Sequence, residues 1–232
     1  MSPLVPLAAP AIIGVPAYGY PHSGSMWDGL AELDGGSIVI VNPDNGPGDS
    51  VDPTYERAMI PLREHRVTMY GYVDTAYGKR TVGEVIADAE RFVEMYRTTG
   101  IFLDQIPGEA DAVAYLGEIS AALRRDHLQV AFNPGQPVID RRLVPLADHI
   151  MNFEGDVDLY RRTEFPAWAD EAPAGLWWHL VYDVAGSDDL GAVLDRAAGL
   201  GAGVVFVTDG LMPNPWDHLP HYWHEELARV RR

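Results

Sequence analysis

The chain has 232 residues, with 17 Lys and Arg against 34 Asp and Glu, a formal net charge of −17, and no cysteine. This acidity argues against nucleic acid or an anionic membrane as a partner, and the lack of cysteine excludes disulfides, thiolate metal sites and cysteine nucleophiles. No apolar stretch reaches the roughly 18 residues of a membrane span, so no membrane insertion is expected. A cationic or neutral ligand stays open, as does an acidic surface that serves solubility alone.

The first ten residues, Met1 to Pro10, lack the basic segment and continuous apolar run of an export signal. We therefore expect a cytoplasmic location for the chain as written, with secretion by a removed or non-classical signal left open. No linker or low-complexity tract interrupts the sequence, which predicts a single domain over residues 1–232.

Eight short runs rich in apolar and β-branched residues recur along the chain and are predicted to be strands. Their starts lie roughly 20 to 35 residues apart, which is typical of a strand followed by a crossover helix. The predicted strands are Ile12 to Tyr18, Ser37 to Asn42, Arg66 to Asp74, Gly100 to Gln105, Leu128 to Asn133, His149 to Glu154, Leu176 to Asp183 and Gly203 to Asp209.

The segments between these runs carry helix signals. Asp52 followed by Pro53 is typical of a helix N-cap and first helical position, and Thr81 to Glu84 has the pattern of a capping box. Eight strands alternating with helices in one domain of this length predict the α/β class and a (β/α)8 TIM barrel.

Active sites of this fold lie at the carboxyl ends of the strands. Nearly every predicted strand ends in an acid, an amide or a tyrosine, although several such residues are expected to cap the helices that follow. Strand alternation places Asp104 inside the barrel, and Asn152 and Glu154 inside with Met151 and Phe153 outside. The candidate site residues are Tyr18, Tyr72, Asp74, Asp104, Gln105, Asn133, Asn152, Glu154, Tyr182, Asp209 and Trp216.

The residue types favour one chemistry over others. Lys79 is the only lysine and follows the third strand, which argues against Schiff-base aldolases, while the scattered histidines argue against a metal centre. No metal or cofactor is therefore expected. Asp104 and Glu154 end the fourth and sixth strands, and a carboxylate pair among aromatic side chains is what glycosidic cleavage uses. The tryptophans that are candidates for stacking on sugar rings are Trp27, Trp177, Trp178, Trp216 and Trp223.

Four motifs in order and in register carry a family resemblance: Tyr70 to Gly78, Gly100 to Asp104, Phe132 to Gly135 and Asn152 to Gly155. Over almost its whole length the chain resembles the spherulin 4 family (spherulation-specific family 4, glycoside hydrolase family 135). The resemblance implies a barrel hydrolase that cuts α-1,4-linked galactosamine or N-acetylgalactosamine polymers from within. It assigns the catalytic carboxylates to Asp104, as nucleophile, and Glu154, as acid/base, and implies a polysaccharide or oligosaccharide substrate.

One position departs from the family pattern, which has Asp-Glu where this chain has Asp104-Gln105. An amide has nearly the shape of the acid but cannot exchange a proton at neutral pH. Two hypotheses follow: a retaining endo-glycosidase, and a non-catalytic glycan-binding barrel in which Gln105 records lost catalysis. Strand alternation predicts that Gln105 starts the loop and faces away from Asp104, which favours a positioning role.

Overall fold

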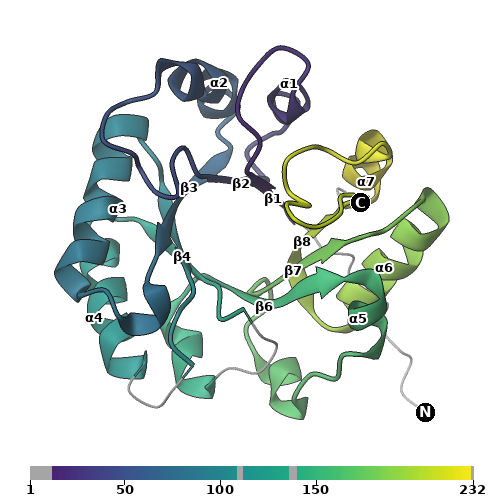
Figure 1. Cartoon of the computed structure of the whole chain (residues 1–232). Helices are drawn as coiled ribbons and strands as arrows, with labels where there is room; N and C mark the ends of the chain where they lie inside the picture. The colour runs from purple at the N-terminus through teal and green to yellow at the C-terminus, as the bar shows by residue number, and fades with distance from the viewer. Residues whose placement is uncertain (1–11, 109–111, 136–139, 231–232) are drawn as a thin grey trace.

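The computed structural model describes residues 12–108, 112–135 and 140–230. Eight parallel strands close into a barrel in the order of the chain (Figure 1). They are β1 (Ile12–Ala17), β2 (Ile38–Val41), β3 (Thr68–Asp74), β4 (Gly100–Asp104), β5 (Gln129–Phe132), β6 (His149–Asp156), β7 (Trp177–Tyr182) and β8 (Ala202–Val207). The predicted (β/α)8 barrel is confirmed, while the expectation for Met1 to Pro10 lies outside the described residues.

Each predicted strand is present, with ends shifted by no more than two residues. The third strand begins at Thr68 because Arg66 has a φ of 60°, a left-handed conformation that a strand cannot contain. The sixth strand runs past Glu154 to Asp156.

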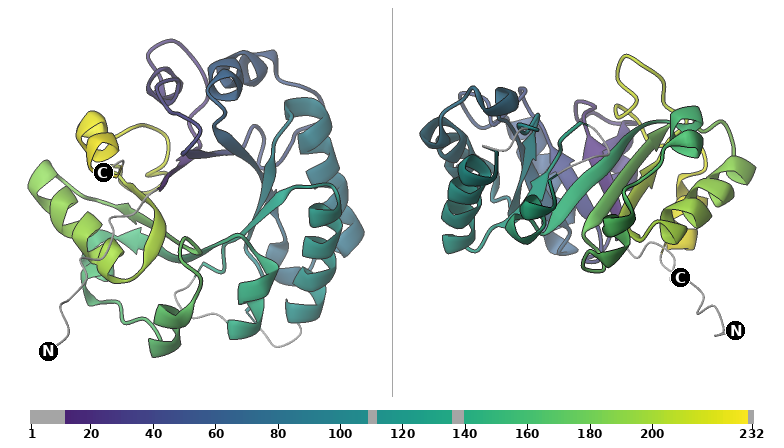
Figure 2. Two further views of the ribbon diagram at one scale, coloured as in Figure 1. Left: turned by 180° about the vertical axis from the view of Figure 1, so that it is seen from behind. Right: turned by 90° about the horizontal axis from the view of Figure 1, so that it is seen from below.

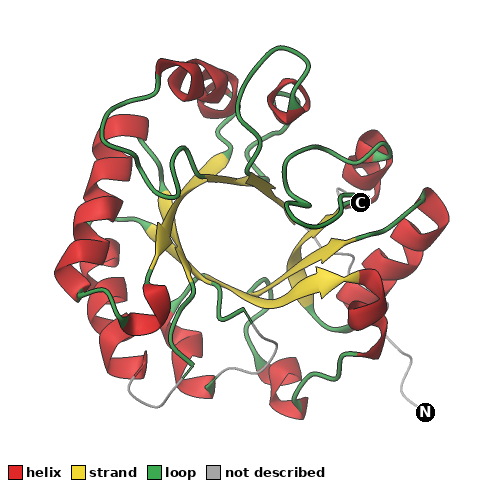
Figure 3. Ribbon diagram, viewed as in Figure 1, coloured by secondary structure: helices red, strands yellow, loops and turns green. Residues whose placement is uncertain are grey.

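Helices form the outer layer around the strands (Figures 2 and 3). They are α1 (Met26–Leu30), α2 (Pro53–Glu64), α3 (Val82–Tyr96), α4 (Ala112–Arg125), α5 (Val157–Arg162), α6 (Ser187–Gly199) and α7 (Trp223–Val230), with 3-10 turns η1 (Ala76–Gly78), η2 (Arg141–Leu146) and η3 (Ala167–Glu171). Between β5 and β6, the described residues form only the 3-10 turn η2 in the position of a crossover helix.

The predicted helix starts are present as side-chain caps. The Asp52 carboxylate accepts a hydrogen bond from the Thr54 N–H at 2.7 Å, and Pro53 is the first residue of α2. Thr81 and Glu84 form both halves of the capping box that begins α3. These caps satisfy backbone N–H groups that have no partner within the helix.

Aromatic side chains fill the barrel interior below its carboxyl end. Tyr70, Phe102, His149 and Trp178 contact one another with ring centroids 6.0 to 6.3 Å apart. Gly100 makes room for this layer, since a Cβ there would lie 2.4 Å from Tyr70 Cε1. The interior is therefore packed, and the space available to a ligand lies above this layer.

Candidate active site

A cavity of ≈ 200 Å³ opens at the carboxyl end of the strands, above the aromatic layer. Phe102, Met151 and Leu180 lie among its apolar residues, and both predicted catalytic carboxylates are in its wall. Five predicted site residues line it: Tyr18, Asp104, Gln105, Asn133 and Glu154. The ends of β4 and β6 and the segments directly after β1, β4 and β5 thus bring these side chains to one place.

Asp104 ends β4 and is paired in register with Asp74 of β3. Its Oδ2 accepts a hydrogen bond from the Tyr72 hydroxyl at 2.7 Å. Burial raises the pKa of Asp104, and the neighbouring charge of Asp74 adds to this. Hydrogen bonds from Tyr72, the Gln105 N–H and Asn133 act in the opposite direction and favour the carboxylate.

Glu154 lies on β6 and accepts two hydrogen bonds, one at each oxygen. The Asn133 Nδ2 donates to Oε2 at 2.9 Å, and the Trp216 Nε1 donates to Oε1 at 3.1 Å. Glu154 is an exposed residue that faces the open cavity, although the barrel wall encloses its carboxyl group closely enough to desolvate it. This enclosure raises the pKa of Glu154, and the charge of Asp104 raises it further.

The two carboxyl groups share one cavity, and the charge of Asp104 raises the pKa of Glu154. The Asn133 amide is a hydrogen-bond partner of both and favours their ionised forms. A carboxyl with a raised pKa can hold a proton near neutral pH and donate it, while its partner remains ionised. A pair of this kind can protonate a leaving oxygen and attack, or activate water at, the adjacent carbon.

A β-bulge directs Glu154 into the cavity. Met151 pairs with Trp178 of β7, but Phe153 pairs with the next residue, His179, so Asn152 is an extra residue in β6. Met151 lines the cavity, and Phe153 packs outside the barrel against Tyr160 of α5 at 4.6 Å between ring centroids. The prediction of Met151 outside was wrong, because the bulge at Asn152 shifts the alternation by one residue, while Phe153 lies outside and Glu154 inside as predicted.

Gln105 lines the same cavity as Asp104, so the prediction that it faces away was wrong. Its φ of 49° takes the backbone out of the strand conformation, and alternation no longer applies. The Gln105 carbonyl accepts hydrogen bonds from the Thr75 hydroxyl and the Tyr77 N–H, both at 2.7 Å. These contacts from the loop after β3 hold the turn that points the Gln105 side chain into the cavity.

Three other predicted residues contact the carboxylates or their partners without lining the cavity. Tyr72 and Trp216 donate to Asp104 and Glu154, and the Tyr182 ring packs edge-on against Trp216 at 5.9 Å. Tyr72 and Trp216 therefore hold the two carboxylates by hydrogen bonds, and Tyr182 packs against Trp216. The Tyr18 ring likewise packs edge-on against the Tyr72 ring.

The remaining predicted residues are used elsewhere. Asp74 accepts a hydrogen bond from the Ala76 N–H at 2.5 Å, Asn152 is buried in the bulge, and Asp209 Oδ2 lies 2.6 Å from His221 Nδ1. None of the three lines the cavity.

The positions of the aromatic residues differ most from the predicted stacking role. Trp27, Trp177, Trp178 and Trp223 are buried away from the cavity and offer no stacking surface there. Tyr77, which is 59% exposed, lines the cavity and was not predicted, because it lies in a loop beyond the strand end. Its place in the Tyr70 to Gly78 motif was the available signal.

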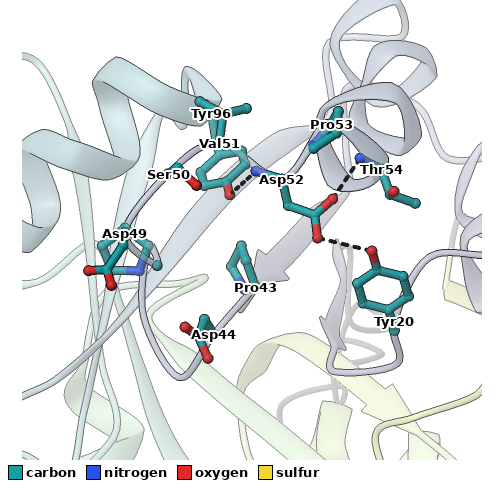
Figure 4. Close-up of a pocket in the computed structure, with 12 residues that line it drawn as sticks. Tyr20, Pro43, Asp44, Asp49, Ser50, Val51, Asp52, Pro53, Thr54 and Tyr96 are labelled. Atoms are coloured by element: carbon teal, nitrogen blue, oxygen red, sulfur yellow. Dashed lines mark hydrogen bonds between the residues drawn. The ribbon is translucent and has the colours of Figure 1, made fainter.

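A larger cavity, of ≈ 580 Å³, lies beside the loop after β2 (Figure 4). The Asp52 carboxylate accepts hydrogen bonds from Thr54 and from the Tyr20 hydroxyl at 3.0 Å, and the Tyr96 hydroxyl accepts from the Asp52 N–H. The Asp52 carboxylate therefore caps α2 and links it to the segment that carries Tyr20. Both of its oxygens are used in these structural hydrogen bonds.

In residues 12–108, 112–135 and 140–230, no group of three His, Asp or Glu side chains converges in a way that could hold a metal ion. No helix in those ranges is long and apolar enough to cross a membrane.

Comparison with known proteins adds to this geometry. The model of the family described as spherulation-specific family 4 matches residues 12–230. The chain belongs to this family. Spherulin-4 of Physarum polycephalum is a relative within spherulation-specific family 4, 30% identical over 212 residues, which are 84% of this chain and 62% of the relative. The match therefore spans less than two thirds of that relative's length.

The family's fold is also that of solved structures. The crystal structure of Aspergillus clavatus Sph3 in complex with GalNAc has a TM-score of 0.83 and 25% identity, over 97% of this chain and 99% of Sph3. A chitinase domain from Pyrococcus furiosus, crystallised with chito-oligosaccharides, has a TM-score of 0.59 and 12% identity over 98% and 97% of the two chains, which shows the fold alone. Together the comparisons confirm the family resemblance and the fold.

Proposed function

We propose that this chain is a glycoside hydrolase that cleaves α-1,4-linked galactosamine or N-acetylgalactosamine polymers from within. The observation that carries the proposal is the carboxyl pair of Asp104 and Glu154 in one cavity, each with a raised pKa and both within reach of Asn133. The sugar class is supported by the GalNAc bound to Sph3, whose structure matches nearly the whole chain.

The proposed mechanism retains the anomeric configuration. Glu154 protonates the glycosidic oxygen as that C–O bond breaks, and Asp104 attacks the anomeric carbon to form a glycosyl ester. Glu154 then takes a proton from water, which displaces Asp104. The Tyr72 hydrogen bond favours the ionised form of Asp104, as a nucleophile requires, while the enclosure of Glu154 favours the protonated form, as an acid requires. Retention requires the two carboxyls about 5 to 5.5 Å apart in the productive state.

The test is an assay of defined α-1,4-linked galactosamine and N-acetylgalactosamine oligomers with the wild type, Asp104→Asn and Glu154→Gln. We expect cleavage by the wild type and a loss of about 10³-fold or more in each variant. Proton NMR of the first product should show the α anomer. A β product would disprove retention, and no cleavage or binding of either oligomer would disprove the galactosaminide assignment.

The second candidate function is non-catalytic glycan binding, and the position of Gln105 in the cavity favours it. A glutamate there could exchange a proton, and this amide cannot. If catalysis has been lost, Gln105→Glu should create or greatly raise turnover. If Gln105 positions the substrate, turnover should change by less than about tenfold, or roughly 1.4 kcal/mol in the barrier.

A further inference from the structure

A cationic cleft lies at the amino ends of β3, β4 and β5, the end of the barrel opposite the candidate active site. Its volume is ≈ 520 Å³, and its charged and polar lining residues include Arg63, Arg66, Arg97, His127, Thr99 and Gln129. No carboxylate is among the residues that line it, although the chain carries a formal charge of −17. The cleft therefore concentrates positive charge on an acidic protein.

The ion pairs of the described residues include none of the three guanidinium groups of this cleft. Arg63 donates to the backbone carbonyls of Glu56 and Tyr96, and Arg66 and Arg97 make no ion pair within the described part of the chain. Burial lowers the pKa of Arg63 and the nearby charge of Arg97 lowers it further, while the charge of Glu56, which does not line the cleft, acts in the opposite direction. Two like charges thus face each other without a carboxylate in the cleft between them, an arrangement that an anion would stabilise.

The backbone at these positions is unusual. Arg66, Arg97 and His127 follow the C-termini of α2, α3 and α4, which lie side by side around the barrel (Figure 1), and their φ values are 60°, 55° and 60°. Glycine, or asparagine, is favoured in this left-handed region because a Cβ is strained there. The other non-glycine residues with positive φ in the described chain lie in loops at the opposite end of the barrel. Two of these helix ends therefore carry an arginine and the third a histidine where glycine would relax the turn, and all three side chains line one cleft.

We propose that this cleft binds a phosphate-type oxyanion, either a diphosphate or a small molecule that bears phosphate groups. Guanidinium groups donate paired hydrogen bonds to phosphate oxygens, and the imidazole, hydroxyl and amide of His127, Thr99 and Gln129 supply further donors. The volume of the cleft exceeds that of one phosphate group. Because the cleft and the carboxyl pair lie at opposite ends of the barrel, the anion would bind without competing with a glycan.

Sodium pyrophosphate is the probe, titrated calorimetrically into the intact chain at about 50 mM ionic strength, where charge screening is weak. The variants are Arg97→Asn and Arg66→Gly, which remove a charge and tolerate the left-handed backbone, so both should fold with melting temperatures at or above that of the wild type. The control is Arg162→Ala, which removes an exposed arginine of α5 that has no partner among the described residues.

We expect saturable binding by the wild type, binding at least about tenfold weaker in Arg97→Asn and Arg66→Gly, and unchanged binding in Arg162→Ala. Pyrophosphate should raise the melting temperature of the wild type and of the control, and not of the cleft variants. No saturable binding by the wild type would overturn the proposal. So would an equal loss in Arg162→Ala, which would show that only net charge matters.

Discussion

The indole N–H of Trp216 donates to Oε1 of Glu154 across 3.1 Å, although the two residues are 62 positions apart in the chain. Trp216 lies between β8 and α7, so the segment after the last strand reaches back to the carboxylate of β6. This donor favours the ionised form and lowers the pKa of Glu154, while burial raises it. The loop after β8 thus helps to set when Glu154 carries its proton.

Replacing Trp216 by phenylalanine should remove the donor and keep an aromatic ring. The pKa of Glu154 should rise, because a hydrogen bond to the charged form is lost, and the limb of the pH–rate profile that reports the acid should move to higher pH. We expect turnover of galactosamine oligomers to fall about tenfold. Trp223→Phe is the control, since the Trp223 Nε1 is buried without a hydrogen-bond partner. An unmoved limb in Trp216→Phe would contradict this role.

The carboxylates near the cavity should favour a polymer with free amines over an acetylated one. Asp74 and Asp104 lie in register at the ends of β3 and β4, and each ammonium near a partly exposed carboxylate gains on the order of 1 kcal/mol. Binding of the two oligomers to the Glu154→Gln variant can be measured by calorimetry at low and high salt. We expect tighter binding of the amine form, and a preference that fades with salt. Equal affinity at low salt would refute the prediction.

Gly100→Ala should destabilise the barrel. The added methyl group would meet the Tyr70 ring at 2.4 Å inside the aromatic layer, where no open space accepts it. Overpacking of this kind costs about 1 to 3 kcal/mol, measurable as a lower midpoint of urea unfolding. Gly83→Ala in α3 is the matched control, because nothing lies within 4 Å of its Cβ position, and helix propensity should make that variant slightly more stable. Equal effects of the two substitutions would disprove the packing argument.

Glu226 of α7 should make stability fall as pH rises. It is fully buried, its Oε1 accepts a hydrogen bond from the Val207 N–H at 2.7 Å, and burial raises its pKa well above the usual value. A raised folded pKa contributes stability that is complete below the unfolded pKa, near 4.5, and is lost as pH rises through the folded pKa. Each unit of difference is worth about 1.4 kcal/mol.

Urea unfolding of the wild type and Glu226→Gln between pH 5 and 9, a window of about four units, tests this. The wild type should lose stability with rising pH, and the variant should lose less. Glu90→Gln, at an exposed position in α3, should behave like the wild type. Parallel pH curves for the wild type and Glu226→Gln would show that Glu226 does not titrate in this range.

The barrel could be predicted because apolar runs such as Gly100 to Leu103 end at glycine, proline or polar residues and recur at the spacing of βα units. The two carboxylates could be predicted because the fold places strand ends at one mouth. The direction in which individual side chains point was harder to predict from the sequence. Gln105 and Met151 were assigned by alternation, but a positive φ at Gln105 and the bulge at Asn152 override it there.

The tryptophans show a second limit of sequence patterns. Trp178 lies near the start of β7 and Trp216 in the segment between β8 and α7, yet one fills the barrel interior and the other donates a hydrogen bond to Glu154. Composition cannot separate these roles, since both depend on which space the neighbouring strands leave open. The cationic cleft was missed for a related reason: its arginines come from separate helix ends that only the folded barrel brings together.

The extra residue Asn152 affects how relatives should be aligned. A chain with one residue fewer between the positions of Met151 and Glu154, aligned without a gap, would match Glu154 to a side chain that faces the helices. Residue identity in a single alignment column would then misreport which members of the family carry the second carboxylate. Counting residues between the strand start and the acid identifies the equivalent of Glu154 more securely than the column does.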